Sequence, residues 1–277
     1  MKIDWFITRI CNQASFCRFC YAPWNFFPPD VSTERALKIC EQLAQLGADT
    51  VTICGGEPFM YPGLDRVVRK LHALAIKVVL YTSATSDQHD LHSLLPYVDF
   101  LSLPVDAVSA VAVQKMRGQS QFSRVSGVLA SLSRVPNRPK VKVGTVVTRQ
   151  NIDDLNLIGD FLRESGTVDV WRLYEFSPYG IGKHNEKRYL LAPAEFEQAV
   201  VKAKLRNETC TTHHLAIAER SREDNKGYCL IIDSAGSFYR YAERYIPLGV
   251  TIYDSLDRIV AQYDQELHHR QKAWHEG

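Results

Sequence analysis

The sequence lacks a strong excess of charge of either sign, and it has no apolar run of membrane-spanning length. Its 33 Lys and Arg residues are nearly balanced by 31 Asp and Glu residues, which gives a formal net charge of +2. Such a balance provides no global attraction to nucleic acid or to a membrane surface. Because no apolar stretch approaches the ~18 residues that a transmembrane helix needs, we expect a globular chain without a membrane or nucleic-acid partner.

A secretion signal is also missing from the first residues. Asp4 interrupts the apolar start, and no small-residue cleavage site follows it. The seven cysteines are an odd number, which argues against a complete disulfide framework. We therefore expect a cytoplasmic protein whose cysteines are reduced or bind a metal.

Segments of strand length alternate with segments of helical period through the first 176 residues. Strands are expected at residues 2–9, 50–54, 77–82, 98–103, 140–147 and 169–176. Helices are expected at residues 32–46, 64–74, 87–95, 122–132 and 153–164. Regular alternation with buried-type strands predicts an α/β fold, a partial (β/α)6 TIM-like barrel with a parallel sheet.

The pattern changes after residue 176. Residues 177–188 are expected to form a solvated loop, 193–205 a helix, 228–232 and 237–241 a hairpin, and 253–274 a terminal helix. No linker, internal repeat or low-complexity segment divides the chain. We expect a barrel core at residues 1–190 and a short C-terminal α/β extension at 191–277 that caps it.

Three cysteines follow the first expected strand directly. Cys11, Cys17 and Cys20 lie on one short polar loop, so their thiolates can converge on one metal centre. A structural zinc ion needs four protein ligands, and the next cysteine, Cys40, falls inside the first expected helix. Three thiolates on a four-iron cluster leave one iron open for a substrate or cosubstrate. The competing interpretation is three structural cysteines packed in a core.

A second motif, Gly55-Gly56-Glu57-Pro58, follows the second expected strand. The two glycines let a ligand approach the backbone closely, and Glu57 can accept a charged amine. The alternative is an ordinary tight connection between strand and helix. In β/α barrels the active site is built from the loops at the carboxyl ends of the strands, which is where both motifs stand.

The combination of the three-cysteine loop, Phe19 before its third cysteine and the Gly-Gly-Glu-Pro turn resembles the radical S-adenosylmethionine (SAM) superfamily. The resemblance continues to about residue 178, through the segments 81–84, 101–106, 115–118 and 141–151. The sequence is loosely similar to the viperin-like and MoaA-like members of this superfamily. The usual cysteine spacing is C-x3-C-x2-C, whereas this chain has C-x5-C-x2-C, a longer spacing that a few members share.

The resemblance implies one [4Fe-4S] cluster and SAM as cofactors. Cys11, Cys17 and Cys20 would hold the cluster, and an electron from it would cleave SAM to a 5′-deoxyadenosyl radical that abstracts hydrogen from the substrate. An external one-electron donor of flavodoxin or ferredoxin type is implied. By position, the other expected SAM contacts are Gly55, Gly56, Glu57 and Pro58 for the methionine amine, Arg117 for its carboxylate, Thr82 and Ser83 for the ribose, and Thr148 on the same rim. A solvated arginine is the alternative for Arg117.

The remaining cysteines and the paired histidines are expected to bind no metal. Cys40, Cys54, Cys210 and Cys229 form no Cys-x-x-Cys pair, so no auxiliary cluster is predicted. The pairs at 213–214 and 268–269 have no partner at ligand spacing and are interpreted as solvated histidines.

Three functions remain open from the sequence. The first is a radical SAM enzyme, an oxidoreductase or lyase of biosynthesis, that acts on a small polar metabolite of nucleotide-like or anionic type. Basic groups on or near the sixth strand could hold phosphate or carboxylate, namely Arg172, Lys183, His184, Lys187 and Arg188. The second is modification of a ribosomal peptide or maturation of a metallocofactor, which the expected absence of an N-terminal recognition domain disfavours. The third is a non-enzymatic iron–sulfur or zinc protein.

Overall fold

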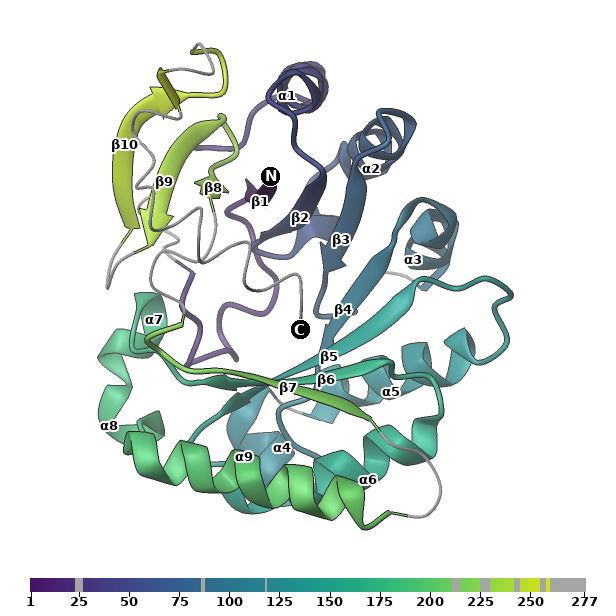
Figure 1. Ribbon diagram of the computed structural model, residues 1–277, viewed down its shortest axis with the longest axis vertical. Coiled ribbons are helices and arrows are strands. Elements are labelled where there is room, and N and C mark those ends of the chain that lie inside the picture. The colour runs from purple at the N-terminus through teal and green to yellow at the C-terminus, as the bar shows by residue number, and fades with distance from the viewer. Residues whose placement is uncertain are drawn as a thin grey trace. The chain divides into compact units, whose positions relative to one another are not determined.

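The computed structural model describes residues 1–22, 27–85, 88–117, 119–210, 215–224, 230–241, 245–254 and 258–259. The chain has an α/β fold in which most neighbouring strands are parallel (Figure 1). It divides into two compact units. Unit 1 comprises residues 1–11, 24–80 and 223–277, and unit 2 comprises residues 12–23 and 81–222. The division at residue 190 that the sequence suggests stays a prediction.

Unit 1 contains a sheet in the order β10-β9-β8-β1-β2-β3. Its strands are β1 (Lys2–Thr8), β2 (Thr50–Gly55), β3 (Lys77–Tyr81, whose last residue belongs to unit 2), β8 (Leu230–Ile232), β9 (Ser237–Tyr241) and β10 (Tyr245–Thr251). Strands β8, β1, β2 and β3 are parallel, while β9 and β10 are antiparallel to their neighbours. The helices are α1 (Thr33–Gln45), the short 3-10 helix η1 (Pro58–Met60) and α2 (Leu64–Ala73).

Helix α1 shows why the local sequence gives this structure. The Ser32 side chain accepts a hydrogen bond from the Arg35 amide at 3.4 Å and caps the helix, as the sequence predicts. Its buried residues Ala36, Ile39, Cys40 and Leu43 recur at helical spacing. Gly47 then takes a φ of +73° and ends the helix.

Unit 2 contains the four parallel strands β4 (Phe100–Pro104), β5 (Lys140–Val147), β6 (Val170–Glu175) and β7 (Ala216–Arg220), in that order. Its helices are α3 (Gln88–Leu94), η2 (Leu95–Tyr97), α4 (Ala110–Met116), α5 (Gln119–Leu132), η3 (Ile152–Asp154), α6 (Leu155–Ser165), α7 (Gly180–His184), α8 (Glu186–Tyr189) and α9 (Pro193–Glu208). Helices α6 and α9 pack against each other on the same side of the sheet (Figure 1).

The two faces of the unit 2 sheet differ in chemistry. Side chains alternate between faces along a strand, and the parallel register keeps each face continuous. Val141, Val143, Trp171 and Leu173 share one face, and each is at most 1% exposed. The opposite face carries polar side chains, and it is on this face that a ligand could be held.

The structure corrects several expected elements. Within the loop expected at residues 177–188, residues 180–184 and 186–188 instead belong to the two short helices α7 and α8. Helix α4 and strands β7 and β10 were not expected from the sequence. The expected hairpin is confirmed within residues 230–241, where β8 and β9 pair antiparallel. The terminal helix expected at 253–274 lies almost wholly outside the described residues.

No helix in the described ranges has both the length and the apolar character needed to cross a membrane.

Candidate active site

The part of the cysteine loop in unit 2 is a series of tight turns. The amides of Phe16 and Cys17 both donate to the Gln13 carbonyl, at 2.9 and 3.0 Å, and the Cys20 amide donates to the Cys17 carbonyl at 3.0 Å. The long spacing between the first two cysteines is thus taken up by a hydrogen-bonded turn. Cys17 is 6% exposed, and the Ala22 amide donates to the Cys20 sulfur at 3.4 Å. Backbone hydrogen bonds therefore hold the loop in shape.

Helix α7 packs against the cysteine loop. Gly180 has a φ of +51°, and a Cβ at this position would lie 2.5 Å from the Ala22 carbonyl oxygen. The Gly182 amide donates to the Cys20 carbonyl at 2.9 Å, and the Asn185 side chain donates to the Arg18 carbonyl at 3.1 Å. The glycines of this segment are therefore needed for a close backbone approach rather than for loop flexibility.

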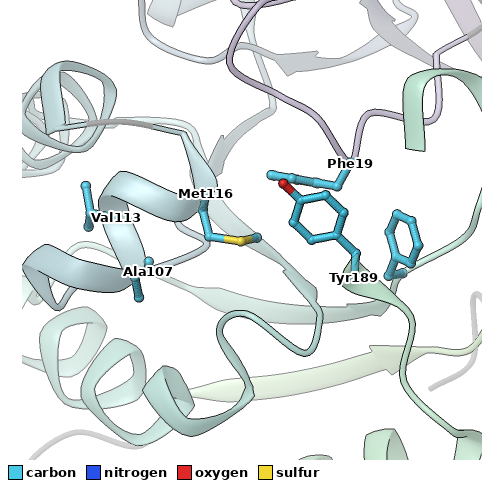
Figure 2. Packing of buried hydrophobic residues seen from close by; sticks show 7 residues of the cluster. Phe19, Ala107, Val113, Met116 and Tyr189 are labelled. Atoms are coloured by element: carbon cyan, nitrogen blue, oxygen red, sulfur yellow. The ribbon is translucent and has the colours of Figure 1, made fainter. Parts of the chain in front are cut away.

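The loop is also anchored by an apolar side chain. Phe19 is 4% exposed and packs edge-on against Tyr189 of α8, with ring centroids 5.7 Å apart. Figure 2 shows these two rings beside Met116 of α4, within a cluster that also contains Ala107 and Val113. The aromatic residue of the motif thus fixes the cysteine loop to the core of unit 2.

Arg117, directly after α4, joins an acidic residue to a cysteine. Its Nε donates to Asp106 Oδ2 in an ion pair, and its Nη1 donates to Cys17 Sγ at 3.0 Å. The guanidinium carbon lies 5.0 Å from the centre of the Phe19 ring. Burial alone would lower the pKa of Arg117, but the charges of Asp106 and Cys17 outweigh it and raise the pKa. The guanidinium is therefore a fixed positive charge at the thiolate.

Asp106 is held as firmly as its partner. Its side chain is 1% exposed, and its Oδ1 accepts the Val146 amide at 2.7 Å. Its carbonyl accepts from the Asn151 side chain at 2.6 Å. The carboxylate accepts one hydrogen bond on each oxygen and the backbone is held by Asn151, so Asp106 fixes the guanidinium in turn.

The Gly-Gly-Glu-Pro turn lies in unit 1 at the end of β2. Gly55 has a φ of +126°, and a side chain there would collide with the Thr8 carbonyl at the end of β1. The Gly56 amide donates to that carbonyl at 2.7 Å, and the Glu57 amide donates to the Ile10 carbonyl at 2.9 Å. Glu57 is 1% exposed, and Pro58 begins η1. The turn thus joins the end of β2 to the chain that leads into Cys11, and this close approach requires glycine.

The expected ribose contacts lie in a loop tied to the rest of unit 2. The Thr82 hydroxyl accepts the Ala84 amide at 3.0 Å, and the Ser83 hydroxyl lies 3.1 Å from that of Thr85. Thr85 in turn donates to the Asn12 side chain, next to Cys11 in the sequence, at 2.9 Å. The structure therefore brings the loop after β3 to the start of the cysteine loop.

Thr148 is engaged within its own turn. It is completely buried, and its hydroxyl donates to the Asn151 side chain at 2.9 Å. The Thr148 amide donates to the same oxygen at 2.7 Å. These bonds give Thr148 a role in the turn after β5; its proposed contact with SAM stays a prediction.

A cluster of cations and tyrosines covers the polar face of the unit 2 sheet. Lys142 of β5, Arg172 and Tyr174 of β6, and Arg220 of β7 share this face by register. Lys142 donates to the Tyr81 hydroxyl, which lies 3.4 Å from the Tyr174 hydroxyl. None of the positions of β4 to β7 on this face, all of which are described, is Asp or Glu. The face therefore suits a ligand with several negative charges.

The acidity of Tyr174 reports this local charge. Burial alone would raise its pKa, but Lys142, Arg172 and Arg220 favour the phenolate and lower the pKa to about 8. The Tyr174 ring also lies against Gly144, where a Cβ would be 3.1 Å from the ring. Glycine at 144 therefore makes room for the tyrosine in the middle of the cationic cluster.

The predicted substrate residues divide between two places. Arg172 belongs to the cationic cluster, whereas the others are exposed on the short helices α7 and α8, namely Lys183, His184, Lys187 and Arg188. Lys183 pairs with Glu186 at 2.9 Å. The sequence analysis missed Lys142 and Arg220. Lys142 could have been found from the sequence, because it is a basic residue inside a mostly apolar strand. Arg220 could not, because its place on this face depends on the register of β7, which no local pattern encodes.

Cys40 and Cys54 are buried packing residues, whereas Cys210 is partly exposed. Cys40 is completely buried in α1, and burial raises the pKa of its thiol to about 12. Cys54 is 7% exposed in β2. Cys229 and the histidine pairs at 213–214 and 268–269 lie outside the described residues.

The donor set at the cysteine loop fits an iron–sulfur cluster. Thiolates are the ligands that iron–sulfur clusters take, and a cation already neutralises one of them. The Tyr189 hydroxyl is buried and has no hydrogen-bond partner among the described residues, and burial raises its pKa. In the described ranges no three His, Cys, Asp or Glu side chains are placed to hold a single metal ion. A cluster does not need such a group, because each thiolate binds a different iron.

The chain is similar in sequence to known proteins. Residues 5–162 match the radical SAM superfamily. The chain is 24% identical over 271 residues to an S-adenosylmethionine-dependent nucleotide dehydratase of Flammeovirga pacifica, covering 90% of this chain and 88% of that protein. It is 26% identical over 180 residues to a probable GTP 3′,8-cyclase of Sulfolobus acidocaldarius, covering 64% of this chain but only 56% of the relative.

A solved structure shares the fold. SuiB of Streptococcus suis bound to S-adenosylmethionine superposes with a TM-score of 0.73 at 17% identity. The match covers 96% of this chain and 66% of SuiB.

Proposed function

The chain belongs to the radical SAM superfamily, and from this premise we propose that it acts on a small anionic metabolite of nucleotide-like type. Radical SAM enzymes use a [4Fe-4S] cluster and SAM, so the chain is an enzyme with these cofactors. When bound, the cluster supplies the electron that cleaves SAM to a 5′-deoxyadenosyl radical, which abstracts hydrogen from the substrate. A purely structural iron–sulfur or zinc protein is therefore no longer a candidate.

The residues that hold the cofactors are the first part of the proposal. Cys11, Cys17 and Cys20 bind the cluster. The turn at residues 55–58 binds the methionine amine, and Thr82 and Ser83 contact the ribose. Support comes from the glycines that bring the ends of β1 and β2 together, and from the hydrogen bond between Thr85 and Asn12.

The cationic face of unit 2 carries the substrate proposal. Lys142, Arg172 and Arg220 gather three positive charges on one sheet face with no carboxylate among its strand positions. Guanidinium and ammonium groups that share one face fit the oxygens of phosphate through charge-assisted hydrogen bonds. The similarity to the nucleotide dehydratase over 90% of this chain favours a nucleotide over other anions.

Modification of a peptide is the competing function. SuiB has also been solved with its precursor peptide SuiA, but at 16% identity this likeness concerns the fold alone. A peptide backbone carries no repeated negative charge, so it offers these three cations no charged group to bind. The two functions therefore differ in what they predict for Lys142.

The test uses protein reconstituted anaerobically with iron and sulfide and reduced with dithionite. Formation of 5′-deoxyadenosine is measured with and without each nucleoside triphosphate, and nucleotide binding is measured by equilibrium dialysis. We expect one nucleotide to accelerate SAM cleavage. Lys142→Ala should weaken its binding by about 10- to 100-fold, because a hydrogen bond to a charged group is worth ~1.5–3 kcal/mol.

Lys202→Ala is the matched control, since it removes the same charge from an exposed position on helix α9, away from the cationic face. It should leave nucleotide binding nearly unchanged. If no nucleotide binds, or if the two variants weaken binding equally, the cationic face is not the substrate site. If precursor-type peptides alone accelerate SAM cleavage, the peptide function replaces the proposal.

Further features of the proposal concern architecture and partners. We propose that the strand-helix repeats form the partial (β/α)6 barrel, with residues 191–277 as its C-terminal extension. The electron donor is proposed to be a flavodoxin or ferredoxin, because radical SAM enzymes take electrons from external donors. The cytoplasm is the proposed compartment, since it keeps the thiolates of the cluster reduced.

A further inference from the structure

We propose that Arg117 sets the reduction potential of the iron–sulfur cluster by donating a hydrogen bond to the Cys17 ligand, independently of any contact with SAM. The inference rests on the proposed cluster ligands. It departs from the role that resemblance suggests for this arginine, which is to pair with the methionine carboxylate.

The geometry leaves the guanidinium little freedom. Nε is bound to Asp106, Nη1 is bound to Cys17 Sγ at 3.0 Å, and the guanidinium carbon lies 5.0 Å from the centre of the Phe19 ring. The Arg117 side chain is only 18% exposed. Two of its three nitrogens are thus engaged within the chain before any ligand binds.

The partners of Arg117 hold it from several directions. Asp106 is fixed by the Val146 amide, and Phe19 is fixed by Tyr189. The hydrogen bond to Cys17 joins residues 100 positions apart in the sequence. These contacts hold the positive charge of Arg117 next to Cys17 Sγ.

A charge at that place acts on the cluster directly. Reduction adds a negative charge, which a donor to a ligand sulfur stabilises, and hydrogen bonds to sulfur are among the main determinants of cluster potential. The effect is stronger at low exposure, because the local dielectric constant is lower than that of water. Arg117 should therefore make the cluster easier to reduce.

The two roles of Arg117 make different predictions. A pure carboxylate clamp would change the affinity for SAM and leave the SAM-free cluster untouched. A donor to the ligand sulfur changes the potential before SAM is added.

The experiment is an anaerobic redox titration of the full-length, reconstituted, SAM-free protein, followed by electron paramagnetic resonance of the reduced cluster. Wild type is compared with Arg117→Gln, which loses the charge, and with Arg117→Lys, which keeps the charge but cannot reach both partners. Lys115→Gln is the control, because it removes a charge from an exposed position on α4, the helix that Arg117 follows.

We expect the midpoint potential of Arg117→Gln to be more negative than that of wild type, with Arg117→Lys between them and Lys115→Gln unchanged. If Arg117→Gln does not retain its iron, a negative shift in Arg117→Lys supports the proposal and an unchanged potential overturns it. An unchanged SAM-free potential together with weaker SAM binding assigns Arg117 to the carboxylate and overturns the proposal. Failure of wild type to assemble a cluster would instead refute the proposed cysteine ligands.

Discussion

Replacement of Gly180 by alanine tests whether the start of α7 holds the cysteine loop. Gly180 combines a left-handed φ of +51° with a space in which a Cβ would lie 2.5 Å from the Ala22 carbonyl oxygen and 2.9 Å from the Tyr21 carbonyl carbon. Both contacts are with backbone atoms, so no side chain can rotate away. The variant must either move the loop or detach α7 from it.

The expected loss of stability in Gly180→Ala is the sum of separate contributions. A non-glycine residue in the left-handed conformation costs ~1–2 kcal/mol, of which the stiffer unfolded chain returns ~0.4–1 kcal/mol. Crowding in a packed site adds ~1–3 kcal/mol, and loss of the hydrogen bond from Gly182 to Cys20 adds ~1 kcal/mol. Gly166 offers a matched control, since it has a φ of +64° and nothing within 4 Å of its Cβ position. Gly180→Ala should therefore destabilise the chain by about 2–4 kcal/mol more than Gly166→Ala.

The assay is urea-induced unfolding of both variants, with the iron content after reconstitution as a second measurement. The difference in unfolding free energy between the variants isolates the collision, because both have the same conformational cost. Gly180→Ala should also retain less iron, since its collision partners lie next to Cys20. Equal stability of the two variants, with equal iron, would refute the docking of α7 on the cysteine loop.

Three further predictions follow from the site. Ultraviolet titration should show one tyrosine that ionises near pH 8 in wild type and is absent from Tyr174→Phe. Added phosphate should move this ionisation to higher pH, because a bound anion neutralises the cations that favour the phenolate. Identical titrations of wild type and Tyr174→Phe below pH 9 would contradict this prediction. Cys17→Ala should fall from about four irons per chain to nearly none, whereas Cys40→Ala should keep them; equal loss would exclude Cys17 as a specific ligand. The Cys40 thiol should resist maleimide at pH 8 in the folded chain and react after denaturation, because burial raises its pKa to about 12; rapid native labelling would show that α1 opens.

The missed elements of the fold share a physical cause. Helices α7 and α8 have five and four residues, too few for an apolar stripe to repeat. Their stability comes from contact with the cysteine loop through Gly182 and Asn185. Strand β10 contains Pro247 and Gly249, which disfavour a strand in the sequence, but Pro247 is tolerated because β10 is the edge strand of the unit 1 sheet.

The candidate site was predictable where its residues are neighbours in the sequence. The cysteine loop and the Gly-Gly-Glu-Pro turn are short motifs, each read from a few consecutive residues. The cationic face was not predictable, because Lys142, Arg172 and Arg220 stand on three strands whose register is set by pairing. Arg172 alone was expected, and the exposed lysines near it in the sequence were grouped with it only by proximity along the chain.

The sequence by itself determined the superfamily, the order of most strands and helices, and the identity of the proposed cluster ligands. These properties depend on local spacing, on periodicity and on residue chemistry, which a single sequence carries. Only the tertiary structure decided that Arg117 contacts Cys17, that α7 holds the cysteine loop, and that three cations share one sheet face. Each of these depends on packing between segments far apart in the chain, and no local pattern encodes such packing.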